Sequence, residues 1–506
     1  MRLLLIFFTL ALAAASAGDP LAQTQTITVA AGGDLQAALK AAHPGMTILL
    51  ERGATYVGNF LLPAAGPDAD GDRVITLRTK GDADLPAEGT RIGPDAAPRL
   101  AKLQSPNGSP ALATAAGARG WRLELLEVLP TRNGSNDIIR LGDGSSEQQS
   151  LDRVPSHFVL DRLYIHGDAE KGQKRGIALN AADVTISHSY ISDIKAVGQD
   201  SQAIGGWNGP GNYVIEDNYL EAAGENVMFG GADPAIPNLT PTHIVVRNNL
   251  MTKPLAWRDA RPPWSVKNIF ELKNARDVLI EHNVMEHCWR QAQAGYAILF
   301  TVRNQDGACA WCQIEHVEFR GNFVRDVAAA MQILGTDPNH PSRQTNGIVV
   351  RDNVFDGIDG KQWGGDGYFL QLSDAPRDVT IDHNTIVQQQ SGGLVKIVHG
   401  VAQNVSITNN IAMHGNYGII GSNHGVGADS INAYLPGATV THNVLAGGRA
   451  ASYPSGNLFP SVDELRKQFV DFAAHDYRLT PSSAWRKAGM DRRSLGANLE
   501  IVAHPD

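Results

Sequence analysis

The sequence of 506 residues is poor in cysteine and in aromatic residues, and it contains no long helical pattern. It has 3 cysteines, and aromatic residues make up 7% of the chain. A scaffold held together by many disulfides is therefore excluded. Charged residues at 19% and hydrophobic residues at 43% are typical of a folded chain. The net charge of −9 argues against nucleic acid as a general partner.

Long hydrophobic runs are also missing, except at the N-terminus. Arg2, the apolar run Leu3–Ala15 and the small residues Ala15-Ser16-Ala17 predict a signal peptide over residues 1–17, with cleavage after Ala22 as an alternative. No second apolar run reaches about 18 residues, so the sequence predicts no membrane span. We expect a secreted or periplasmic protein that is a monomer.

The three cysteines lie close together in the sequence, at Cys288, Cys309 and Cys312. In an exported protein we expect one disulfide from Cys288 to Cys309 or to Cys312, with one thiol left over. Cys309 and Cys312 have the spacing of a redox motif, but no βαβ pattern precedes them. A zinc site would need a fourth ligand. A structural disulfide is the favoured interpretation.

The most prominent feature that the chain does have is a repeated eight-residue pattern, of which Val278–Met285 is one copy. Apolar and polar residues alternate up to an asparagine, and an apolar pair follows. The asparagines are Asn218, Asn249, Asn283, Asn322, Asn353, Asn384, Asn410 and Asn443. Their spacing averages about 32 residues, and a period of 20–50 residues indicates a solenoid, a propeller or an array.

The pattern inside each repeat selects among these architectures. Alternation on both sides of a polar turn predicts two short strands, and a further strand follows in each repeat. No helical pattern separates the strands, and propeller blades would need four antiparallel strands in each repeat. The sequence therefore predicts an all-β, right-handed parallel β-helix with one coil per repeat. The asparagines are expected to stack as a structural amide ladder.

The ends of the chain depart from the repeat. We expect a β-helix over residues 26–447, with regular coils from Phe158 to Leu445 and irregular coils over residues 63–156. A short helix from Asp34 to Ala42 is predicted to cap the first coil and to protect its strand edge. Residues 448–506 are predicted to form an irregular, partly helical C-terminal cap.

Together, the capping helix, the asparagine turns and the export signal resemble the pectate-lyase-like superfamily of right-handed parallel β-helix proteins. The stretches Glu221–Gly231 and Val266–Ala275 are also similar to uncharacterised bacterial β-helix proteins. The resemblance implies a secreted lyase, hydrolase or epimerase that binds an extracellular polysaccharide along one parallel sheet. The polygalacturonase motifs Asn-Thr-Asp, Asp-Asp, Gly-His-Gly and Arg-Ile-Lys do not occur. The pectate-lyase pattern Trp-Ile-Asp-His and its Arg-x-Pro-x-x-Arg partner are missing too, so these familiar subfamilies are disfavoured.

Alternation in the last strand of each repeat predicts which side chains lie on the outer face of that sheet. If Phe270 and Leu272 point inward, Glu271 and Lys273 point outward. The same count in later coils gives the outward residues Arg303, Gln332, Gln371 and Lys396. Successive coils stack about 4.8 Å apart, so these residues become neighbours.

The coil before this strand and two insertions contribute further candidates. Glu225 and Asn226 begin the equivalent strand one coil earlier, and Trp264 and Trp311 lie in insertions beside the sheet. The predicted substrate-binding residues are Asn226, Trp264, Trp311, Gln332, Gln371 and Lys396. Indole faces could stack on sugar rings there.

The chemistry that these residues suggest is β-elimination from a uronic acid. Lys273 or Arg303 is the candidate base, and Glu225 and Glu271 could hold a Ca²⁺ ion, which prefers oxygen ligands. The first alternative is a glycoside hydrolase that uses Glu225 and Glu271 as its acid and base. The second is a non-catalytic glycan-binding or surface protein.

Each of these candidates also has a purely structural interpretation. Glu271 and Lys273 could form a cross-strand charge pair, and Arg303 could hold its loop in place. Glu225 could cap backbone amides, and the tryptophans could pack the loops from which they come.

Overall fold

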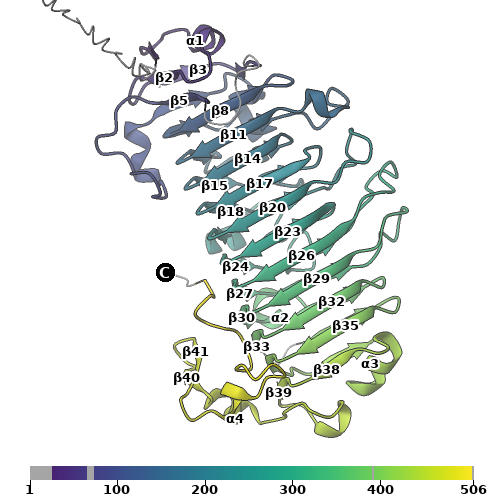
Figure 1. The fold of residues 1–506 in the computed structure, drawn as a ribbon. Coiled ribbons are helices and arrows are strands. Elements are labelled where there is room, and N and C mark those ends of the chain that lie inside the picture. Colours follow the sequence, from purple (N-terminus) through teal and green to yellow (C-terminus); the bar gives the residue numbers. More distant parts are fainter. Residues whose placement is uncertain (1–24, 65–72, 390–391, 504–506) are drawn as a thin grey trace, which may run out of the picture.

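The computed structural model describes residues 25–64, 73–389 and 392–503, in which 39 strands form three long parallel sheets (Figure 1). Each complete coil contributes one strand to each sheet, and the strands stack along the long axis of the molecule. This is the predicted parallel β-helix. Residues 1–17, the predicted signal peptide, lie outside the described residues.

The sheets are named A, B and C in the order in which each coil visits them. Sheet A consists of β1 (Thr26–Val29), β2 (Thr47–Leu50), β5 (Ile75–Thr79), β8 (Arg119–Glu124), β11 (Ser156–Asp161), β14 (Ala182–Ser187), β17 (Gly211–Glu216), β20 (Thr242–Arg247), β23 (Ala275–Glu281), β26 (Ile314–Arg320), β29 (Asn346–Arg351), β32 (Arg377–Asp382), β35 (Gln403–Thr408) and β38 (Thr439–Thr441).

Sheet B consists of β3 (Thr55–Val57), β6 (Ala101–Gln104), β9 (Leu126–Val128), β12 (Tyr164–His166), β15 (Tyr190–Ile194), β18 (Tyr219–Ala222), β21 (Leu250–Thr252), β24 (Val284–Cys288), β27 (Phe323–Val327), β30 (Val354–Ile358), β33 (Thr385–Gln388), β36 (Ile411–Met413) and β39 (Val444–Ala446). Sheet C consists of β4 (Phe60–Leu62), β7 (Leu112–Thr114), β10 (Asp137–Leu141), β13 (Arg175–Leu179), β16 (Gln202–Gly206), β19 (Glu225–Phe229), β22 (Phe270–Leu272), β25 (Tyr296–Thr301), β28 (Ala329–Leu334), β31 (Leu370–Ser373), β34 (Val395–Val398) and β37 (Ile419–Gly421).

The corner between sheets A and B carries the predicted asparagine ladder. In the rung at Asn322, the side-chain Oδ1 accepts hydrogen bonds from the backbone N and the Nδ2 of Asn283, both at 3.0 Å. Its Nδ2 donates to the carbonyl oxygens of Ile280 and Arg320 and to Oδ1 of Asn353. The bond from Nδ2 of one asparagine to Oδ1 of the next repeats in every coil from Asn218 to Asn443, and the ladder ends one rung later at Asn457. The predicted structural role of these asparagines is confirmed.

Both ends of the coil stack are covered (Figure 1). At the first coil lies α1 (Leu35–Ala41), whose N-cap Asp34 accepts a hydrogen bond from the backbone N of Ala37 at 2.9 Å, as the sequence predicts. At the other end, the segment of α3 (Ala428–Tyr434) packs Ile431 and Leu435 onto the main core. The helix α4 (Val462–Arg466), which begins with a capping box, and the antiparallel pair of β40 (Phe469–Asp471) and β41 (Asp476–Leu479) pack against sheet B. The remaining helices are α2 (Gly360–Trp363), η1 (Pro94–Arg99), η2 (Arg132–Gly134), η3 (Leu151–Arg153), η4 (Leu255–Asp259), η5 (Ala450–Ser452) and η6 (Ala484–Lys487).

The described part of residues 63–156 forms early coils with long loops between their strands, as predicted. One expectation needs correction. The disulfide joins Cys309 to Cys312, whereas Cys288 is a free thiol. Cys288 is wholly buried at the end of β24, where its Sγ lies against the carbonyl oxygen of Lys267 at 3.3 Å. The two paired cysteines share one tight turn, which brings their sulfurs together.

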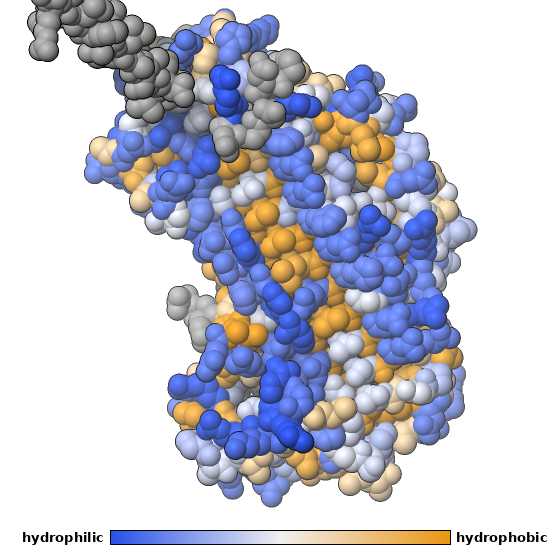
Figure 2. Space-filling view, in the orientation of Figure 1, coloured by the Kyte–Doolittle hydropathy of each residue, from blue (hydrophilic) through white to orange (hydrophobic). Residues whose placement is uncertain are grey.

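In several coils the outward side chains of sheet A are aliphatic and offer no polar group for catalysis. Val214, Val245 and Leu279 stand in register there, and Figure 2 shows an apolar band along this side of the molecule. Polar side chains border the band. Among the described residues, no helix has the length and apolar character needed to cross a membrane.

Candidate active site on the outer face of sheet C

In each coil the chain turns from sheet B into sheet C at a corner. The residues at this corner occupy equivalent positions in successive coils. The corner row, as it is called below, consists of Gln202, Glu225, Asn268, Tyr296, Ala329, Tyr368, Gly393 and Tyr417. In the coil of Asn268, the next two residues, Ile269 and Phe270, both point into the core. Glu271 then points outward, so the strict alternation of a strand is broken once at this corner.

A second outward row runs parallel to the corner row. Strand registers place Met228, Glu271, Leu299, Gln332, Gln371 and Lys396 one above another. The structure thus brings the predicted residues Glu271, Gln332, Gln371 and Lys396 onto one face. Their role in substrate binding or catalysis stays a prediction.

Glu225 is wholly buried and incompletely paired. Its Oε2 accepts a hydrogen bond from Nε2 of Gln202 at 2.8 Å, and Gln202 in turn accepts from Nε of Arg175 at 3.0 Å. Its Oε1 accepts no hydrogen bond from any described residue, although Nζ of Lys267 lies 3.5 Å away. Burial, with the neighbouring Glu271 carboxylate as the second cause, raises the pKa of Glu225 to about 7.

Glu271 is held from three directions. Its Oε2 accepts from Nδ2 of Asn268 at 3.1 Å, and its Oε1 accepts from Oγ1 of Thr301 at 3.2 Å. Nζ of Lys273 lies 3.3 Å from the same Oε1. The side chain of Lys273 reaches this position across Gly231, where a Cβ would lie 3.5 Å from its Cδ. Glu271 and Lys273 therefore do form the charge pair that is the structural alternative for these residues.

Lys267 is a site residue that the sequence reasoning missed. Its Nζ lies 2.6 Å from Oδ2 of Asp200 and 3.5 Å from Oε1 of Glu225. Burial alone would lower its pKa, but the carboxylates of Glu225 and Asp200 outweigh burial and raise it. Lys267 therefore stays an ammonium ion. The signal available in the sequence was its place directly before Asn268, at the end of a long insertion.

Lys253, a second missed residue, lies underneath the same corner. It is wholly buried, and its Nζ donates to the carbonyl oxygens of Ala222 and Gly224 and to Oδ1 of Asn226. Burial lowers the pKa of Lys253 to about 8. These bonds fix the backbone on both sides of Glu225.

One predicted substrate-binding residue lies in the core, and two others pack against neighbouring elements. The assignment of Asn226 to substrate binding is wrong, because its side chain is wholly buried and donates to the carbonyl oxygens of Leu220 and Thr252. Trp311 packs against the core and donates to the carbonyl oxygen of Leu239 at 3.0 Å. Trp264 packs beside a buried tryptophan cluster at the corner of sheets B and C. The structural alternative for both tryptophans therefore has support, and their role in substrate binding stays a prediction.

Arg303 is tied to its loop. Its Nη1 lies 2.9 Å from Oδ1 of Asp337, and Oδ2 of the same carboxylate accepts from the backbone N of Asn304 at 2.8 Å. The structural alternative for Arg303 therefore has direct support. The role of Arg303 as a base has no support beyond the position of this residue on the outer face of sheet C.

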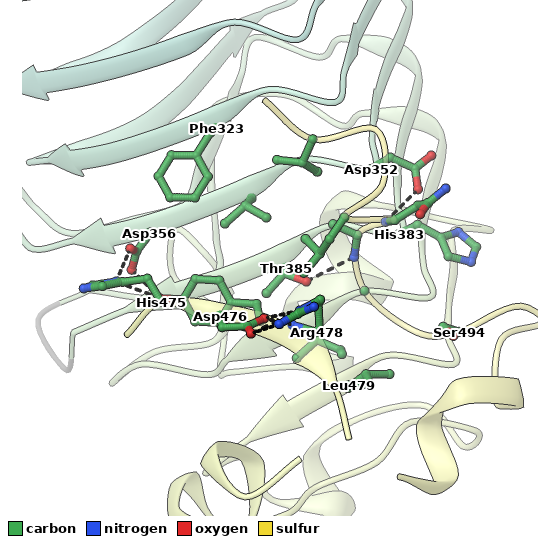
Figure 3. A pocket seen from close by; sticks show the side chains of 18 of the residues that line it. Phe323, Asp352, Asp356, His383, Thr385, His475, Asp476, Arg478, Leu479 and Ser494 are labelled. Carbon is green, nitrogen blue, oxygen red and sulfur yellow. Dashed lines mark hydrogen bonds and ion pairs between the residues drawn. The ribbon is translucent and has the colours of Figure 1, made fainter. Parts of the chain in front are cut away.

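A cavity of about 1640 Å³ lies away from this centre. It is bounded by the outer face of sheet B and by the C-terminal segment (Figure 3). On one wall, Asp356 accepts hydrogen bonds from Oη of Tyr477 at 2.7 Å and contacts Nδ1 of His475 at 2.6 Å. The Phe323 and Val354 side chains of sheet B contribute an apolar floor. These contacts join the C-terminal cap to the coils.

One cluster of metal-ligating groups occurs among the described residues, formed by Asp233, Cys309 and Cys312. The two cysteines are joined by the disulfide, so their sulfurs are not free thiolates. The carboxylate of Asp233 accepts hydrogen bonds from three backbone N–H groups of the loop, at Gln305, Asp306 and Ala308. This cluster is therefore explained as a loop anchor.

Comparison with protein families found no match, and comparison with curated proteins found none. Among solved structures, the alginate lyase AlyGC of the PL6 family is 15% identical with a TM-score of 0.51, and the match covers 94% of this chain and 57% of AlyGC. A mannuronic acid specific family 6 lyase from human gut microbiota is 13% identical with a TM-score of 0.51, covering 88% and 93%. The GH87 α-1,3-glucanase of Streptomyces thermodiastaticus is 14% identical with a TM-score of 0.50, covering 88% and 71%. These likenesses show the fold, a right-handed parallel β-helix.

Proposed function

We propose that the protein binds an acidic polysaccharide along the outer face of sheet C and cleaves it by β-elimination. The observation that carries the proposal is which groups a substrate can reach. The side chains of Glu225 and Glu271 are 0% and 1% exposed, whereas those of Lys267 and Lys273 are 14% and 16% exposed. A glycan on this face would meet Lys267, Lys273 and the exposed carboxylate of Asp200, but neither Glu225 nor Glu271.

This accessibility suits elimination from a uronic acid better than hydrolysis. Elimination needs a positive group beside the sugar carboxylate and a group that moves a proton. Lys267, fixed by Asp200 and Glu225, supplies the positive charge in the proposal. Hydrolysis would need two carboxyl groups on either side of the glycosidic bond.

Lys273 is the proposed proton-transfer group. In its neutral form it takes the proton from C5 of the uronate, the C4–O4 bond breaks, and a C4=C5 double bond forms. The ammonium of Lys273 is then stabilised by Glu271, 3.3 Å away, until it returns the proton to the departing O4. Atoms and charge balance over the cycle, and no further reactant is needed.

A calcium ion is a proposed partner of this centre. Two buried oxygens, Oε1 of Glu225 and Oδ1 of Asn268, accept no hydrogen bond from the described residues, and the Glu271 carboxylate lies beside them. Oxygen atoms of this kind suit a hard cation such as Ca²⁺. Bound there, the ion would add positive charge beside the substrate carboxylate. Lys267 already provides one such charge, so we expect Ca²⁺ to assist and not to replace it.

A glycoside hydrolase is the second candidate, and one observation favours it. The pKa of Glu225, raised to about 7, leaves this carboxyl partly protonated near neutral pH beside a second carboxylate. Acid and base pairs of glycosidases show this division. The two carboxyl groups would have to become accessible in the complex for this function to hold.

The test is a panel of uronic-acid polysaccharides, with and without Ca²⁺, read for the ultraviolet absorbance of unsaturated products and for reducing ends. We expect absorbance and reducing ends to rise together in the native protein and to be lost in Lys273→Met and Lys267→Met. The matched control is Lys171→Met, at an exposed lysine in another coil. Reducing ends without absorbance, lost in Glu225→Gln, would replace the lyase by the hydrolase.

A further inference from the structure

The tyrosines of the corner row form a pattern that the proposed catalytic centre does not use. Tyr296, Tyr368 and Tyr417 occupy every second coil, and the small residues Ala329 and Gly393 stand between them. A Cβ on Gly393 would lie 2.8 Å from Cε1 of Tyr368, so the absence of a side chain makes room for that ring. The rings of Tyr368 and Tyr417 stack with centroids 6.5 Å apart and planes 13° apart.

A fixed pair of charges lies beside these rings. Oδ2 of Asp366 is 3.1 Å from Nζ of Lys396 and accepts a hydrogen bond from Oη of Tyr296 at 3.1 Å. The same hydroxyl lies 3.2 Å from Oε1 of Gln371. Nζ of Lys396 also lies 5.6 Å from the ring centroid of Tyr368. The hydroxyl of the buried Tyr296 therefore orients the Asp366 carboxylate and the Gln371 amide oxygen. The ring of Tyr368 orients the ammonium group of Lys396.

These groups are open to solvent, in contrast to the two glutamates. The side chains of Lys396 and Asp366 are 38% and 36% exposed, and Tyr417 is 47% exposed. One face of the Tyr417 ring lies toward Tyr368, which leaves the other face for a ligand. An aromatic face beside a fixed donor and a fixed acceptor is suited to the C–H face and the hydroxyls of a sugar ring.

The position of the cluster on sheet C connects it to the proposed reaction. The coil of Lys396 lies four strands beyond that of Lys273, through β25, β28, β31 and β34. At about 4.8 Å between strands, the separation along the axis is about 19 Å, the length of several sugar units of an extended glycan.

We propose that Tyr417, Asp366 and Lys396 form a distal subsite for a sugar unit of the same glycan that is cleaved at Lys273. The proposal rests on the proposed function and extends it. Because Asp366 balances the charge of Lys396, the subsite recognises the ring face and hydroxyls of a sugar and adds no net positive charge for a carboxylate. Substrates long enough to reach it bind more tightly than short ones, so the enzyme acts on polymers.

The experiment compares uronate trimers with uronate octamers, because a trimer bound at Lys273 is too short to reach Tyr417. We expect Tyr417→Ala to raise KM for the octamer about tenfold with kcat unchanged, which is the sign of lost substrate binding, and to leave the trimer unchanged. Asp366→Asn is expected to act in the same direction. Tyr417→Phe keeps the ring and is the matched control, with an expected KM near that of the native protein.

An equal change for trimer and octamer, or no change for the octamer, would overturn the subsite. A native protein without elimination activity is tested by calorimetric titration with the octamer. Weaker octamer binding by Tyr417→Ala than by Tyr417→Phe then supports the subsite although the lyase proposal has failed. Equal octamer binding by the two variants contradicts the subsite.

Discussion

In each coil, sheet B is joined to sheet A at one corner and to sheet C at another. The two corners differ in whether the same residue type recurs from coil to coil. At the corner with sheet A, one residue type recurs in every coil from Asn218 to Asn457, and each side chain bonds to the next. At the corner with sheet C, the corner row changes from Glu225 to Asn268 to Tyr296 in three successive coils. The first corner satisfies buried backbone groups in the same way many times. The second has no common structural task, so each coil can contribute a different functional group.

The comparison predicts that substitutions at the two corners separate activity from stability. Lys273→Met has the largest expected effect, a loss of activity of about 10²- to 10⁴-fold, because it removes the proposed proton-transfer group. Its free energy of unfolding should also fall, since the buried Glu271 loses its ammonium partner, so the rate is compared per folded molecule. Initial rates on a uronate polysaccharide and urea unfolding measure both quantities. A stable variant with native rates would remove Lys273 from the mechanism.

Asn322→Ala is expected to lower the free energy of unfolding and to leave the activity nearly unchanged. It leaves buried backbone and amide groups of three neighbouring coils without partners, which costs about 2–4 kcal/mol of unfolding free energy. The rate per folded molecule should stay near the native value. Urea unfolding measures the loss, with the exposed Asn339→Ala as the control. A loss no larger than that of the control would show that the ladder is not needed for stability.

The raised pKa of Glu225 gives a prediction about pH. In the unfolded chain a glutamate releases its proton near pH 4.3, whereas folded Glu225 retains it until about pH 7. The contribution of Glu225 to stability is therefore full below about pH 4.3 and is lost as the pH rises to about 7. Glu225→Gln cannot ionise, so its stability relative to the native protein should increase between pH 4.5 and 8, by roughly 1–3 kcal/mol.

Unfolding curves at several pH values measure this difference. Glu170→Gln, at an exposed position, is the control and should follow the native protein across the range. A parallel course for Glu225→Gln and the native protein would mean that Glu225 is ionised as readily in the folded state as in the unfolded chain.

The last rung of the ladder is expected to contribute less to stability than a rung in the middle of the stack. Asn457 lies half-buried at the end of the stack, where its Oδ1 accepts from Nδ2 of Asn443 at 3.0 Å. Water can replace part of these bonds, so Asn457→Ala should cost about 1 kcal/mol, less than the same change at Asn322. Urea unfolding of the two variants side by side is the measurement. Equal losses would contradict a role for burial in the strength of each rung.

The features that could be predicted from the sequence are those that repeat regularly from coil to coil. The ladder and the outward row of Glu271, Gln332, Gln371 and Lys396 follow from fixed spacing and alternation. Asn226 was misplaced because two consecutive residues point inward at the corner of sheet C, which alternation does not anticipate.

The positions of residues in turns and insertions could not be predicted from the alternation of residues within strands. Asp200, Lys267 and Asp366 reach the face of sheet C from segments whose path depends on tertiary packing. The disulfide was mispaired for a local reason, because a tight turn brings Cys309 to Cys312, whereas Cys288 lies in the core.

The central claim is that the glycan lies on the outer face of sheet C. A crystal structure of Lys273→Met with a uronate octamer tests it most directly. The account predicts sugar density that begins beside Lys267 and extends along sheet C to the ring of Tyr417. Density confined to the cavity between sheet B and the C-terminal segment, beside Asp356 and His475, would contradict it (Figure 3).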